Sequence, residues 1–159
     1  MAPFAVLEQE QPEFATRVQA AFDAHGHKIL ATLRRDGAPR VSGIEARFRD
    51  GELWLAGMPR SVKFADLRRD PRMALHSGSD EPDAFRADAK LSGRAIEVTD
   101  AAQLADFADR ASVPAEIQPF ELFRIALEQV VVTALNEARN GLVITSWRPG
   151  RGLSATTRT

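Results

Sequence analysis

Two Asp-Gly pairs separate three short runs of strand-forming residues, and this pattern constrains the fold more than any other part of the chain. In the second run, even positions would share one face of a strand and odd positions the other. An Asp-Gly pair between such runs is a strong signal for a tight turn that joins antiparallel strands. The pattern predicts an antiparallel meander with strands at 28–33, 40–49 and 52–57.

The rest of the chain continues with short strands and has helices between groups of them. Apolar residues at positions 14, 18, 21 and 22 share one helical face and predict a helix over 12–25. Ser61 and Asp100 are suitable N-cap residues for helices that end near residues 70 and 111. Further strands are expected at 72–76, 89–98, 124–136 and 142–147. We expect a loose lead-in at 1–11, an irregular or helical segment at 112–123 and an irregular tail at 148–159.

The order of these elements indicates the fold class. Sequential hairpins favour an antiparallel sheet over a parallel α/β arrangement. Six or seven short antiparallel strands with few helices close most readily into a small barrel. A chain of 159 residues without an evident linker fits one domain over 1–159. We therefore predict a mainly β protein, a six- to seven-stranded antiparallel barrel with inserted helices.

Charge and composition exclude several functional classes. The net charge of −1 gives no global field that would attract nucleic acid or an anionic membrane. The chain has no cysteine, which excludes disulfides and thiolate metal sites. No apolar stretch approaches the roughly 20 residues that span a bilayer, and no signal peptide is evident. We expect a cytoplasmic protein that binds neither nucleic acid nor membrane.

The segment from Met58 to Phe64 (MPRSVKF) is the sharpest candidate for a binding site. It places Arg60 and Lys63 at the start of a predicted helix, where the partial positive charge makes cations unfavourable. A bound anion would reverse this effect, because backbone N–H groups, the Ser61 hydroxyl and two cations can surround a phosphate. The other interpretation is that both cations point into water and Ser61 only caps the helix.

A second candidate lies near the C-terminus, where Trp147 and Arg148 begin the motif WRPGRG. An aromatic side chain followed by arginines and glycines suits stacking on a planar ring with anion contacts nearby. The other interpretation is a tryptophan packed on the end of the barrel, followed by a solvated tail.

No group of residues in the sequence resembles a self-sufficient catalytic site. The chain has no nucleophile motif and no nucleotide-binding loop, and its histidines lack the spacing of metal ligands. An outward-facing carboxylate is the expected role of Glu45, and Gly43 would let a flat ligand approach the strand. If the protein is an enzyme, a cofactor must supply the chemistry. We expect no metal site.

The motifs together resemble the FMN-binding split barrels of the pyridoxamine 5'-phosphate oxidase-like family. That family shows a strand, a D-G-x-P turn, a strand, a D-G turn, a strand, a basic S-x-K-type helix start and an L-R-x-D-P-R helix end. Residues 28–77, which begin KILATLRRDGAPRVSGIEARFRDGELWLAGMPRSVKF, are similar to this pattern. The resemblance extends over about 12–150. The chain lacks the longer C-terminal substrate-recognition segment of true pyridoxamine phosphate oxidases, so that substrate is not expected.

The resemblance implies a homodimer that holds two flavin cofactors at the subunit interface and acts on a small molecule. It places the cofactor phosphate at Arg60, Ser61 and Lys63. The flavin ring is expected along the strand Val41, Ser42, Gly43 and Ile44 and beside the segment that ends at Met58. Trp147 and Arg148 match a C-terminal segment that reaches the cofactor in relatives, in some of them from the partner subunit.

Three functions remain open from the sequence. The leading hypothesis is an FMN-dependent oxidoreductase that reduces or oxidises a small planar substrate. The second is a reductase that uses the deazaflavin coenzyme F-420, whose acidic tail would need the cations Arg148, Arg151 and Arg158. The third is a non-catalytic flavin or haem binding protein, in which one of the three histidines would be a haem ligand.

Overall fold

The predicted meander forms the first half of the sheet in the computed structural model, which describes residues 1–159. Strands β1 (Lys28–Leu33), β2 (Pro39–Arg49) and β3 (Glu52–Gly57) pair antiparallel in sequence order. The β2–β3 turn has positive φ values of 52° at Asp50 and 72° at Gly51. An Asp-Gly pair tolerates this backbone, so the local sequence determines the hairpin.

Three further strands close the sheet into a barrel. β4 (Arg72–His76), β5 (Ala87–Val98) and β6 (Glu121–Leu135) extend the order β3-β2-β1-β4-β5-β6, and β6 also pairs with β3. β5 and β6 start two and three residues earlier than predicted. Their register shifts at Gly93, where a Cβ atom would collide with the Ala126 carbonyl oxygen. The mainly β, six-stranded antiparallel split barrel is confirmed. Its interior is filled by Leu30, Leu53, Leu55, Leu75, Leu91, Phe123, Ile125 and Leu127.

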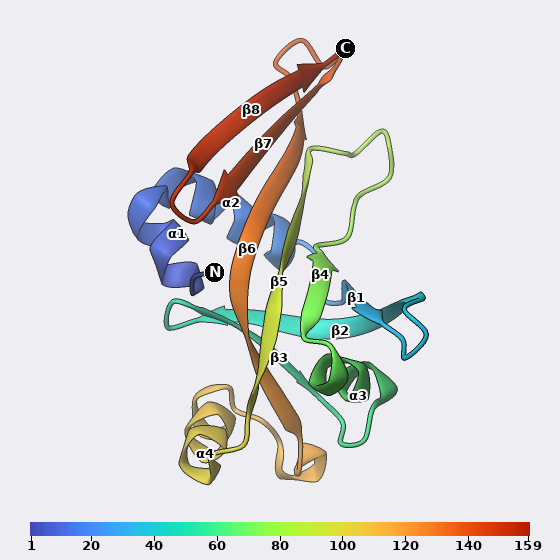
Figure 1. The fold of residues 1–159 in the computed structure, drawn as a ribbon. Coiled ribbons are helices and arrows are strands. Elements are labelled where there is room, and N and C mark those ends of the chain that lie inside the picture. The colour runs from blue at the N-terminus through green and yellow to red at the C-terminus, as the bar shows by residue number, and fades with distance from the viewer.

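The C-terminal residues form a strand, so the prediction of an irregular tail at 148–159 is wrong. β7 (Leu142–Arg148) pairs with β6, and β8 (Gly152–Arg158) pairs with β7 along its whole length. Both strands continue the sheet outside the closed barrel (Figure 1). The sequence of β8 shows no alternation of polar and apolar residues because nearly all of the strand is exposed.

The N-terminal residues form a helix, so the prediction of a loose lead-in at 1–11 is also wrong. α1 (Phe4–Glu10) buries Phe4 and Leu7 completely, and the Ala2 N–H donates to the Leu127 carbonyl at 3.0 Å. A helix of seven residues is too short to reveal its period in sequence, so tertiary packing stabilises it. The predicted helix is present as α2 (Pro12–Asp23), which ends two residues early.

The remaining helices lie in the connections that follow β3 and β5. α3 (Val62–Arg69) joins β3 to β4, and α4 (Ala101–Arg110) follows β5, with a short 3-10 turn η1 (Ala115–Ile117) after it. Asp100 caps α4 as predicted, because its Oδ1 accepts the Gln103 N–H at 2.9 Å. Figure 1 shows α4 at the opposite end of the molecule from the β7–β8 hairpin. None of the helices has both the length and the apolar character required to cross a membrane.

Candidate functional site

A cavity of about 370 Å³ lies between the outer face of the β2–β3 hairpin and the segment that contains α4 and η1. Gly43, Glu45 and Arg47 line it from β2 because odd positions of this strand face outward. Trp54 pairs with Arg47 and Ala56 with Glu45, so the neighbouring strand completes the floor. The volume falls within the range of small-molecule sites, about 300–1,000 Å³.

Aromatic and aliphatic side chains form the wall opposite the hairpin. The Phe107 ring lies 5.5 Å from Trp54 and 5.8 Å from Phe120 between centroids, which are favourable tilted contacts. The segment after α4 continues this apolar wall. Such a wall excludes water from one side of the cavity and suits a flat organic ring. Its residues are Phe107, Ala111, Val113, Pro114, Ile117 and Phe120.

The polar end of the cavity is at the start of α3. Lys63 lines the cavity, makes no ion pair, and donates from Nζ to the Gly43 carbonyl at 3.1 Å. Ser61 occupies the N-cap position, but its side chain makes no capping hydrogen bond and its Oγ is buried without a partner. The first N–H groups of a helix have no intrahelical acceptor. The Phe64 N–H donates to the Ser61 carbonyl at 3.1 Å, whereas the N–H groups of Val62 and Lys63 make no hydrogen bond and are available to a bound anion.

Arg60 has an unusual backbone in the loop that leads into α3. Its φ is 62°, in the left-handed region, and its side chain is exposed. The Arg60 N–H donates to Oε1 of Glu121 at 3.0 Å. The guanidinium group carries no ion pair and is not among the groups that line the cavity. We call residues 58–61 the phosphate loop, after the role that the sequence predicts for it.

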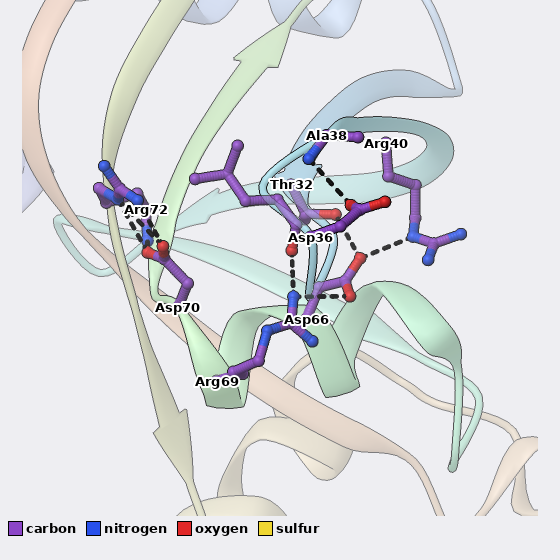
Figure 2. Close-up of polar contacts among 9 residues, drawn as sticks. Thr32, Asp36, Ala38, Arg40, Asp66, Arg69, Asp70 and Arg72 are labelled. Carbon is purple, nitrogen blue, oxygen red and sulfur yellow. Dashed lines mark hydrogen bonds and ion pairs between the residues drawn. The ribbon is translucent and has the colours of Figure 1, made fainter.

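A buried carboxylate fixes α3 to the barrel, as Figure 2 shows. Asp66 is only 2% exposed, and its Oδ2 accepts from Arg40 Nε at 2.6 Å and from Thr32 Oγ1 at 3.0 Å. Its Oδ1 accepts from Arg69 Nη2 at 3.0 Å. Burial alone would raise the pKa of Asp66, but the hydrogen bonds from Arg40, Arg69 and Thr32 outweigh it and lower the pKa. The network holds the helix that carries Lys63.

The structure brings together only some of the residues that the sequence predicted for the site. Gly43, Ile44, Met58 and Lys63 all border the cavity. Val41 lies on the same outward face of β2 as Gly43 and is 69% exposed. Also outside the cavity lining are Ser42, on the inward side of β2, and Arg60 and Ser61, in the phosphate loop.

Trp147 and Arg148 are not brought to the cavity. Trp147 is completely buried in the core, and its Nε1 donates to Oε2 of Glu10 in α1 at 2.9 Å. The prediction that Trp147 stacks on a cofactor is therefore wrong, because the N-terminal helices cover its ring. Arg148 donates from Nη2 to Oε1 of Gln129 at 2.9 Å, on the far part of the sheet.

Sequence reasoning missed the apolar wall formed by 107–120. The segment was expected to contain a helix and irregular structure, without a role in the site. The apolar side chains within this otherwise polar stretch could have indicated a buried surface, but the sequence does not show which part of the fold they face. His27 and Arg47 also line the cavity and were not predicted.

Comparison with known proteins decides the family. The sequence profile of pyridoxamine 5'-phosphate oxidase matches residues 14–134, which is most of the chain. The chain belongs to this family. A comparison with curated protein sequences gives no significant match.

Several solved structures have the same fold at low sequence identity. PhzG from Burkholderia lata 383, in complex with tetrahydrophenazine-1-carboxylic acid, is 16% identical, with a TM-score of 0.66 over 100% of this chain and 97% of PhzG. A pyridoxamine 5'-phosphate oxidase-related, FMN-binding protein from Nostoc punctiforme is 15% identical, with a TM-score of 0.64 over 94% and 96%. Campylobacter jejuni ChuZ is 12% identical, with a TM-score of 0.67 over 89% of this chain and 61% of ChuZ.

Proposed function

We propose that this family member is an FMN-dependent oxidoreductase that acts on a small planar substrate. The observation that carries the proposal is Lys63, which lines the cavity together with the apolar wall and makes no ion pair. Ser61 lies outside the lining at the start of the same helix, and its buried Oγ has no partner, which costs free energy. The FMN-binding relative from Nostoc punctiforme supports the same cofactor.

The residues present fit the two halves of FMN. Lys63, Ser61, Arg60 and the first N–H groups of α3 would hold the phosphate. A Cβ atom at Gly43 would meet nothing within 4 Å, so a flat ring has room to lie against β2. Bound FMN would supply the redox chemistry by exchanging two electrons with the substrate. The protein would orient the two molecules and exclude water through its apolar wall.

The outer face of the sheet supports a homodimer. Ile29 and Val41 are 46% and 69% exposed on neighbouring strands of the outer face. A second copy would cover these exposed apolar residues.

The deazaflavin and haem hypotheses have less support. Arg148, Arg151 and Arg158 belong to the β7–β8 hairpin, at the opposite end of the molecule from α4 and the cavity (Figure 1). Of the three histidines, only His27 lines the cavity. We therefore propose no second function.

The test is a titration of the purified protein with FMN and with riboflavin, which lacks the phosphate. We expect micromolar or tighter FMN binding, and Lys63→Ala should weaken it by about 1.5–3 kcal/mol, the scale of a charge-assisted hydrogen bond. Riboflavin binding should change little in the same variant. Arg35→Ala is the control, because Arg35 is exposed and makes no hydrogen bond or ion pair. Equal losses for both flavins would remove Lys63 from the phosphate site.

A further inference from the structure

The phosphate loop depends on a backbone conformation that its own sequence does not favour. Arg60 has a φ of 62°, which L-residues rarely adopt and which glycine adopts readily. The neighbours Pro59 and Ser61 cannot impose it on Arg60 through their side chains, since Pro59 fixes only its own φ and Ser61 Oγ makes no hydrogen bond. A contact from elsewhere in the fold must therefore stabilise this conformation.

Glu121 makes that contact from the first residue of β6. Its Oε1 accepts the Arg60 N–H at 3.0 Å and lies 3.1 Å from Arg68 Nη2. Glu121 also pairs across the sheet with Gly57, the last residue of β3 before the loop. Arg68 in turn bonds to Glu97 on β5. The carboxylate thus joins the loop, α3 and the closing strand of the barrel.

The second carboxylate oxygen of Glu121 indicates that this residue does more than stabilise the fold. Glu121 Oε2 is buried and has no hydrogen-bond partner, which makes the residue costly for folding. Arg68 would retain Glu97 as a partner without Glu121. The contact that would be lost outright is the one to Arg60.

We propose that Glu121 is a positioning residue, which holds the phosphate loop in the shape that binds the phosphate group of the cofactor. The inference rests on the proposed function, because it assigns the loop to phosphate binding. Glu121 acts through the backbone of Arg60 and does not itself contact the phosphate, since like charges would repel. Its loss should therefore affect phosphate recognition and leave recognition of the flavin ring intact.

The direction of the change in FMN affinity on removal of Glu121 distinguishes a positioning role from a purely electrostatic one. Removing a negative charge beside a phosphate site should strengthen FMN binding if charge alone matters. Positioning predicts that Glu121→Ala weakens FMN binding by about tenfold, the scale of one hydrogen bond to a charged group. Glu121→Gln keeps an acceptor for the Arg60 N–H and should retain the affinity. Glu97→Ala, which removes a similar charge but no contact to the loop, is the matched control.

A double-mutant cycle tests whether the effect passes through Arg60. In Arg60→Gly, glycine adopts the left-handed conformation without needing the Glu121 contact, and the guanidinium group is lost. Adding Glu121→Ala to it should weaken FMN binding by less than about threefold, so the two changes should not be additive. Full additivity would overturn the proposal. If Glu121→Ala does not fold, Glu121→Asp keeps the charge, withdraws the oxygen from Arg60, and should also lose FMN affinity.

The experiment is a titration of each variant with FMN and riboflavin, with thermal melting to establish folding. Weaker FMN binding with unchanged riboflavin binding in Glu121→Ala, and recovery in Glu121→Gln, would support the proposal. FMN binding as tight as in the wild type, or equal losses for both flavins, would overturn it while leaving the proposed function in place. A wild-type protein that binds neither flavin would overturn the proposed function, and this inference with it.

Discussion

At the scale of single residues, the phosphate loop and α3 concentrate the unusual features of the molecule. Arg60 has a left-handed backbone, Ser61 carries a buried hydroxyl without a partner, and Asp66 is a buried carboxylate with three donors. The first two cost free energy, which is common where a protein is shaped for a ligand. Asp66 offsets this cost because it fixes α3, the helix that follows Arg60 and Ser61, to the barrel.

Replacement of Arg60 separates stability from binding. Arg60→Gly should raise the free energy of unfolding by about 0.5 kcal/mol, because glycine relieves the left-handed strain but adds entropy to the unfolded chain. FMN binding should weaken in the same variant, since a cation is lost. Arg60→Ala is the matched control and should weaken binding without gaining stability. Denaturant unfolding and flavin titration measure the two effects, and a destabilised glycine variant would contradict the backbone argument.

The Asp66 network should make stability depend on pH in the acid range. Because hydrogen bonds lower the pKa of Asp66 in the folded protein, its contribution is complete above the unfolded value of about 3.9 and is lost as the pH falls through the folded pKa. Asp66→Asn should cost about 2 kcal/mol at pH 7, less than for a fully buried pair because Arg40 and Arg69 are partly exposed.

Unfolding in urea at a series of pH values measures this dependence. The difference between wild type and Asp66→Asn should shrink as the pH falls below about 4. Asp109→Asn is the control, since Asp109 is exposed and its side chain makes no hydrogen bond or ion pair. A difference that stays constant down to about pH 2 would show that Asp66 contributes no linked protonation.

At the scale of elements, the N-terminal helices close one end of the barrel and the α4 segment closes another face. The Phe48 ring of β2 lies 4.4 Å from Phe4 and 5.3 Å from Phe22 between centroids, so α1 and α2 meet over the barrel. The α4 segment instead leaves a cavity between its apolar side chains and the hairpin. The N-terminal helices therefore pack against the barrel and stabilise it, whereas the α4 segment leaves space for a ligand.

Truncation of Phe4 tests the role of α1. Phe4→Ala should lower the free energy of unfolding by about 3–5 kcal/mol, the cost of removing a buried aromatic ring. The control is Gln9→Ala on the exposed side of the same helix, which should have little effect. Thermal or urea unfolding measures both variants. An unchanged midpoint in Phe4→Ala would mean that the N-terminal segment is as loose as its sequence predicts.

At the scale of the whole molecule, a substitution on the exposed outer face tests the proposed homodimer. Val41→Asp should produce a monomer and weaken FMN binding, because it places a charge on the exposed outer face beside Gly43. Leu153→Asp is the control, since this exposed apolar residue lies beside α2 and away from that face. Light scattering gives the mass. A wild-type monomer at micromolar concentration would contradict the dimer, and a dimeric Val41→Asp variant would place the interface elsewhere.

The sequence determined the elements whose information is local. The Asp-Gly turns and the alternation between them were sufficient to predict β1, β2 and β3, because turn chemistry and strand period are properties of neighbouring residues. The start of α3 with Arg60, Ser61 and Lys63 was recognisable for the same reason. Short strand-forming runs also predicted the later strands, and the family resemblance agreed with their order and spacing.

Only the tertiary structure decided the features that depend on distant contacts. α1 is helical because the barrel buries Phe4 and Leu7, and β8 is a strand because β7 supplies its partners. Trp147 lies in the core and not at the site, since helices from the other end of the chain cover it. The apolar wall of 107–120 and the Glu121 contact to Arg60 likewise join residues far apart in sequence. Local pattern cannot encode which buried surface a segment will meet, because that surface exists only after the barrel has closed.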